Sequence, residues 1–150
     1  MKRVLSIACL SFTIALTLAL QATPAAQGAP TAGMKIASDA DYATHMKEIG
    51  QMNGVLNKSI KAGDAAEAGK AAARMEVLFK NIHGYWNEKK VADATTAAQT
   101  AVTGLQAVQK ALTANDMAAA ETARASVAGT CMACHTAHRE KLPEGGFRIK

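Results

Sequence analysis

Aromatic residues are scarce in this chain of 150 residues: phenylalanine, tryptophan and tyrosine make up only 4% of it, although 49% is hydrophobic. The apolar content therefore comes mainly from alanine, valine, leucine, isoleucine and methionine. A core of such small side chains packs thinly unless its helices approach closely or a bound group fills the remaining space. The composition thus predicts close helix packing, a bound group, or both.

Three other features are missing. The net charge is +5, but it is spread along the chain without a basic block, which excludes the surface typical of nucleic-acid-binding proteins. No segment alternates β-branched and polar residues over a sustained run, so we expect no sheet. We find no nucleophile–base set and no paired carboxylates near the cysteine motif described below, so we do not expect an enzyme.

The first 28 residues are typical of a secretory signal peptide. Two basic residues in positions 1–3 precede an almost unbroken apolar run over 4–20, and small residues lead to Gly28. We expect cleavage after Gly28, with Ala22 as the alternative, and an exported, periplasmic product without membrane attachment. An uncleaved anchor stays open, because the run nearly reaches the roughly 20 residues that cross a bilayer. Cys9 lies inside the run, so we expect no lipid on it.

Helical periodicity organises the rest of the chain after a flexible lead-in over residues 29–38. Apolar residues recur at helical spacing in four segments, with capping residues at their starts and glycine or proline near some of their ends. We expect helices over about 39–61, 65–82, 91–112 and 117–141. The segment 83–87 breaks the pattern and is predicted to be the longest connection.

The segments between the four predicted helices are mostly short. They favour an all-α fold, an antiparallel up-down-up-down four-helix bundle over residues 39–141. Residues 142–150 contain Pro143 and two consecutive glycines, so they are predicted to form a short mobile tail.

The chemistry of the chain is concentrated in the segment from Cys131 to His135. After removal of the signal peptide only Cys131 and Cys134 remain as cysteines, and their spacing puts both thiols on the same side of a helix. Such a pair can form thioethers with the two vinyl groups of one haem, while the histidine that follows ligates the iron. We therefore expect one covalently bound haem c per chain, with His135 as the proximal ligand.

Other uses of this cysteine pair stay open. An exported protein could join Cys131 and Cys134 in a disulfide and serve as a helical binding module. A thioredoxin-like dithiol would require a βαβ unit, and the sequence predicts none. A zinc site could add His138, which shares their helix face, but no fourth ligand with suitable spacing is evident. The histidine directly after the pair, together with the export signal, favours haem.

With this motif on its last helix, the chain resembles the class II c-type cytochromes, the cytochrome c′ family. The resemblance covers residues 39–141 and includes the first-helix segment 46–50. Arg139 matches the family's arginine near the proximal histidine, where it can steady that imidazole or a haem carboxylate. His138 departs from the pattern, because the family has an aromatic residue there. The resemblance also implies a haem near one end of the bundle and, in many members, a homodimer.

The ligand on the other side of the iron decides the function. Met46 lies about seven residues after the start of the first helix, and His135 lies about six before the end of the last. At about 1.5 Å per residue the two reach the same level in an up-down-up-down bundle, so we expect Met46 as the distal ligand. His45, Met52 or an open position are the alternatives. Gly50 and Gly54 continue the row of Met46 at i+4 and i+8, and we expect them to leave a shallow notch beside Met46 that admits the haem or another helix.

Ligation by methionine would make the protein an electron carrier for redox partner proteins in the periplasm. An open position would instead allow it to bind nitric oxide or carbon monoxide, as the resemblance implies for many family members.

Overall fold

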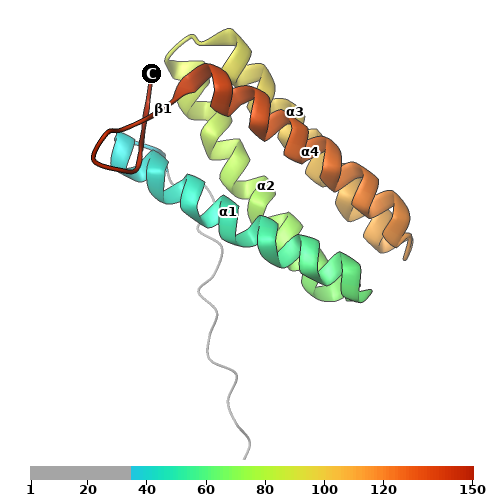
Figure 1. Ribbon diagram of the computed structural model, residues 1–150. Coiled ribbons are helices and arrows are strands. Elements are labelled where there is room, and N and C mark those ends of the chain that lie inside the picture. The colour runs from blue at the N-terminus through green and yellow to red at the C-terminus, as the bar shows by residue number, and fades with distance from the viewer. Residues whose placement is uncertain (1–34) are drawn as a thin grey trace, which may run out of the picture.

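In the computed structural model, which describes residues 35–150, the chain forms four helices and one small hairpin (Figure 1). The helices are α1 (Asp39–Ala62), α2 (Ala65–Glu88), α3 (Ala92–Thr113) and α4 (Met117–His138). Consecutive helices run in opposite directions (Figure 1), so the predicted all-α four-helix bundle with up-down-up-down order is confirmed. The predicted signal peptide lies outside the described residues. Within residues 35–150, no helix has the length and apolar character of a membrane span.

Side chains at three helix starts explain why the helices begin where they do. Ser38 accepts a hydrogen bond from the backbone N–H of Asp41, whose carboxylate accepts one from the N–H of Ser38 in return. Asp64 and Asp116 cap α2 and α4 in the same way, each accepting from the backbone N–H three residues later. A cap of this kind stabilises a helix by about 1 kcal/mol.

The predicted connection over residues 83–87 is wrong, because α2 continues through it to Glu88. Tyr85 and Trp86 follow Ile82 by three and four residues, so a continued helix keeps them on its buried face. The indole N–H of Trp86 donates to the hydroxyl of Tyr42, and the hydroxyl of Tyr85 donates to the carboxylate of Asp39, both at 3.0 Å. These contacts with α1 outweigh the cost of about 1 kcal/mol for a glycine inside a helix.

The C-terminal region also differs from the expectation of a mobile tail and no sheet. The fourth helix ends at His138, and β1 (Arg139–Lys141) pairs antiparallel with β2 (Phe147–Ile149). Gly145 and Gly146 have φ angles of 97° and 82°, which form the turn and which other residues rarely adopt. At the other end of the chain, the expected flexible lead-in is also partly folded, because Ile36 is buried in the core.

The helices pack unevenly around the bundle. The pairs α1–α2, α2–α3 and α3–α4 lie against each other over long stretches, whereas α1 and α4 approach each other at few positions. The side chains that are least exposed are Leu56, Met75, Leu78, Leu105 and Val108. The core is therefore centred on α2 and α3, and the α1–α4 side is the open one.

Candidate functional site

The cysteine motif lies on the last turns of α4 and faces inward. Cys131 follows the buried Val127 by one helical turn, and Cys134 comes three residues later on the same face. Cys131, Cys134 and His135 are each half-buried, whereas Met132 between them is 67% exposed. The two thiols are not joined to each other. This orientation presents both sulfur atoms and the imidazole to the interior of the bundle.

Two adjoining cavities lie in front of these residues. An inner cavity of about 160 Å³ lies inside the bundle and is bordered by Cys131, by apolar side chains of α2 and by alanines of α3. An outer cavity of about 500 Å³ extends from there to the C-terminal hairpin. The residues that border both cavities are Met46, Gly50, Cys134 and His135. The outer volume is in the range of about 300–1,000 Å³ found for ligand pockets.

Of the three candidate distal ligands, Met46 alone borders these two cavities. His45 is buried against α2, where its Nδ1 lies 2.8 Å from the carbonyl oxygen of Asp41 and its Nε2 lies 3.3 Å from the amide nitrogen of Asn81. Both of its ring nitrogens are therefore engaged. Met52 contacts the core but borders neither cavity.

The surroundings of Gly50 show whether side chains of α1 would obstruct a flat group such as haem in the two cavities. Gly50 on α1 is exposed and borders both cavities, and a Cβ atom built on it would meet no heavy atom within 4 Å. The α1 side of the two cavities is therefore open to solvent at this position. The residues present therefore fit a bound group that occupies the open α1–α4 side.

The electrostatics of the motif favour neutral side chains. Burial raises the pKa of both cysteine thiols, and neighbouring negative charge adds to the effect at each. Reactive dithiols, in contrast, have a lowered thiol pKa. Burial also lowers the pKa of His135, and the nearby Arg139 lowers it further. Neutral imidazole is the form that ligates a metal ion.

A zinc site at Cys131, Cys134 and His138 was the alternative use of the motif. Among residues 35–150, no three histidine, cysteine, aspartate or glutamate side chains converge so that they could hold a metal ion. His138 instead lies with Nε2 2.7 Å from a carboxylate oxygen of Asp93, and its ring centroid is 5.1 Å from that of Trp86. His138 thus packs its imidazole against the ring of Trp86 near the end of α2.

Arg139 borders the outer cavity, as do several residues for which the sequence predicts no functional role. Its guanidinium carbon lies 3.8 Å from the centroid of the Phe147 ring, a cation–π arrangement within the hairpin. Lys47 on α1 and Arg148 on β2 border the same cavity. The hairpin residues were missed because that segment was predicted to be mobile, and Lys47 lacked a signal of its own.

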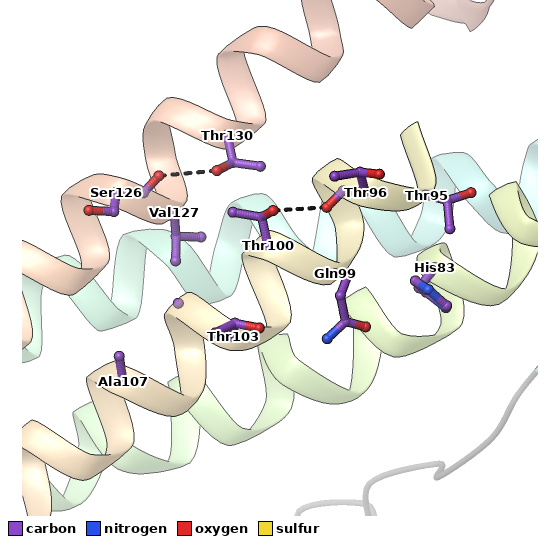
Figure 2. Close-up of a pocket in the computed structure, with 11 residues that line it drawn as sticks. His83, Thr95, Thr96, Gln99, Thr100, Thr103, Ala107, Ser126, Val127 and Thr130 are labelled. Carbon is purple, nitrogen blue, oxygen red and sulfur yellow. Dashed lines mark hydrogen bonds between the residues drawn. The ribbon is translucent and has the colours of Figure 1, made fainter. Parts of the chain in front are cut away.

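A third hollow of about 580 Å³ lies on the outer side of α3 and α4 (Figure 2). Five threonines are among its lining residues, and hydroxyls of two of them bond within their own helix: Thr100 donates to the carbonyl of Thr96, and Thr130 donates to that of Ser126 (Figure 2). His83 is the one titratable side chain among its lining residues. This groove has no cysteine and a single histidine among its lining residues, in contrast to the cavities at the motif end.

No family model, curated protein or solved structure matches this chain. The likeness to cytochrome c′ therefore rests on the motif, its place on the last helix and the bundle itself.

Proposed function

We propose that this protein is an exported c-type cytochrome that carries one haem c, bound covalently to Cys131 and Cys134 and ligated by His135. The observation that carries this proposal is the convergence of all three residues, together with Met46, on two adjoining cavities at one end of a four-helix bundle. The exposed position of Gly50 is consistent with it, because no side chain blocks the α1 side of the two cavities there. This arrangement is also that of class II c-type cytochromes, to which the chain is similar.

The function that the site supports best is electron transfer between redox partner proteins in the periplasm. A bound haem supplies one-electron chemistry. The chain's own residues set its environment. His135 ligates on one side, Met46 is available on the other, and Arg139 offers a positive charge at the cavity mouth. Apolar side chains of α2 around the inner cavity limit the access of water.

Covalent attachment is the first test. In a host that is equipped to attach haem, the protein should keep its haem through acid–acetone extraction and through a denaturing gel. Cys131→Ser combined with Cys134→Ser should abolish this retention, because no thioether can form. The matched control, Cys9→Ser, should retain the haem. A wild-type protein that releases its haem, or never acquires any, would contradict the proposal.

Export is tested separately by N-terminal sequencing of the mature product. We expect the sequence to begin near Ala29 or Thr23, after removal of the apolar segment. An intact Met1 on a soluble cytoplasmic product would count against both export and haem attachment.

Replacement of Met46 separates the electron carrier from a gas-binding protein. Met46→Ala should remove the long-wavelength charge-transfer band of methionine–haem ligation, lower the reduction potential and allow carbon monoxide to bind. Met52→Ala is the matched control and should leave all three properties unchanged. If the wild-type protein already lacks that band and binds carbon monoxide readily, the iron has an open position and binding of nitric oxide or carbon monoxide is the better function.

A further inference from the structure

The C-terminal hairpin lies at the place where α1 and α4 leave the bundle open. Its residues Phe147, Arg148 and Ile149 border the outer cavity opposite Met46 and Lys47 of α1. β2 contacts α1, and the side chain of Ile149 packs against the core. The hairpin therefore takes the position that a direct α1–α4 contact would otherwise occupy.

The hairpin is held in this position by hydrogen bonds to α4 and within itself. The backbone N–H of Lys150 donates to the carbonyl of His138 at 3.1 Å, and its ammonium group donates to the carbonyl of Thr136 at 3.1 Å. The N–H of Leu142 donates to the carbonyl of Gly146 across the turn at 3.2 Å. Side chains on β2 thus have defined places relative to the motif on α4.

The lining of the outer cavity carries more positive than negative charge. Among residues 35–150, its cations are Lys47, Arg139 and Arg148, its carboxylate is that of Asp39, which accepts a hydrogen bond from Tyr85, and its imidazoles are those of His135 and His138. Within residues 35–150, neither Lys47 nor Arg139 forms a salt bridge. A cavity with this lining favours a ligand that presents anionic groups at its mouth.

The guanidinium group of Arg148 has N–H donors that its hydrogen bond to Glu140 does not use. Its Nε donates to the carboxylate of Glu140 at 2.8 Å, which orients the guanidinium on the hairpin. An arginine has five N–H donors, so the terminal nitrogens stay available for a second carboxylate. Lys47 is exposed on the α1 side of the same cavity. The two cations thus approach the cavity mouth from different elements.

We infer that the hairpin is the outer wall of the haem site, and that Lys47 and Arg148 bind the two haem carboxylates. This inference rests on the proposed function. It follows because the carboxylates of haem lie on the side of the macrocycle away from its vinyl groups, so thioethers at Cys131 and Cys134 would leave the carboxylates remote from those thiols and within reach of cations that line the outer cavity. A carboxylate paired with an ammonium or guanidinium group forms a charge-assisted hydrogen bond, about twice as strong as a neutral one.

The test is a double variant, Lys47→Gln with Arg148→Gln, in the haem-loaded protein. Nearby cations favour the ionised carboxylates, so their removal should move the ionisation of the haem carboxylates to higher pH, by about one unit. The measurement is the reduction potential as a function of pH, whose inflection reports this ionisation. The matched control is Lys58→Gln with Lys110→Gln, two exposed cations that border neither cavity. An inflection that coincides in the two double variants would overturn the inference.

Limited proteolysis tests the wall independently of the charges. Trypsin should cleave after Lys141 and Arg148 about tenfold more slowly in the haem-loaded protein than in the haem-free Cys131→Ser/Cys134→Ser variant. The reason is that contact with the bound haem should reduce local unfolding of the hairpin. Equal cleavage rates would show that the hairpin does not enclose the haem. A protein that never carries haem overturns both this inference and the proposed function. Covalent haem with unchanged inflection and unchanged cleavage overturns the inference alone.

Discussion

The contact between α3 and α4, here called the closed seam, differs from the α1–α4 side of the bundle, here called the open seam, and a glycine in each shows the difference. On α3, a Cβ atom at Gly104 would lie 2.6 Å from Cγ2 of Val127 on α4, so glycine is what allows these two helices to approach so closely. On α1, a Cβ atom at Gly50 would meet nothing within 4 Å, and the residue faces the cavities in front of the motif. The first glycine allows two helices to approach closely, whereas the second is exposed on α1 beside the cavities, where α1 and α4 make few contacts. Small residues thus allow close packing between α3 and α4, and they leave the cavities uncovered on the α1 side.

The open seam leaves α1 dependent on α2. The guanidinium of Arg74 donates two hydrogen bonds to the carboxylate of Glu48, at 2.6 and 2.9 Å, and so bridges the two helices. At the motif end, the rings of Tyr42, Tyr85 and Trp86 pack together with centroids 4.8 to 5.7 Å apart. These contacts position the helix that carries Met46 without help from α4.

Filling the open seam should have the largest effect, with opposite signs in the two forms of the protein. Gly50→Leu should destabilise the haem-loaded protein by about 1–3 kcal/mol, because the side chain and the haem compete for one space. The haem-free protein should instead gain up to about 1 kcal/mol, since glycine is unfavourable inside a helix. Denaturant unfolding of both forms measures the difference.

The matched control for this variant is Gly54→Leu. Gly54 lies one turn later on α1, also has free space around it, and borders neither cavity. It should stabilise both forms. If Gly50→Leu behaves like Gly54→Leu in the haem-loaded protein, the seam is not where the haem lies.

Between α3 and α4, even the single methyl group of an alanine should be enough to destabilise the protein. Gly104→Ala should destabilise the protein by about 1–2 kcal/mol, because overpacking costs about 1–3 kcal/mol while the gain in helix propensity offsets about 1. Val127 is β-branched and has little freedom to rotate away. Thermal unfolding of haem-free protein is the measurement.

A double-mutant cycle decides whether this clash is the cause. In the Val127→Ala background, Gly104→Ala should become neutral or stabilising, so the coupling energy should favour the double variant by about 1–3 kcal/mol. Additive effects of the two substitutions would mean that the α3–α4 seam tolerates a methyl group without contact to Val127.

The bridge between α1 and α2 should make a smaller, pH-dependent contribution. The hydrogen bonds from Arg74 hold the pKa of Glu48 below its usual value. Because the folded-state pKa is lowered, the pair stabilises the protein above the ordinary glutamate pKa, and this stability is lost as the pH falls through the lowered value. Glu48→Gln should therefore cost about 1 kcal/mol at neutral pH and progressively less in acid.

Unfolding free energies measured across the acid range provide the comparison. Glu121→Gln removes a pair with Arg124 that lies within one helix, and it should cost only about 0.3–0.5 kcal/mol. Equal costs for the two variants would indicate that the α1–α2 bridge has no special part in holding α1.

Local patterns in the sequence were sufficient for the four helices and for the motif. The caps at Ser38, Asp64 and Asp116 lie within a few residues of the groups they bond, and the spacing of Cys131 and Cys134 determines their common side on any helix. Tertiary packing overruled the local pattern at Tyr85 and Trp86, whose apparent break disappears once α1 provides partners 44 and 46 residues away.

The sequence by itself determined that Met46 and His135 lie at a similar level along the bundle, because helical rise converts residue number directly into height. It could not determine how α1 is rotated. Neighbours on a helix point about 100° apart, so the choice between His45 and Met46 depends on which side of α1 meets α2. Only the tertiary structure decided that His45 turns to Asn81 while Met46 borders the cavities with His135, because that rotation follows from contacts between distant segments.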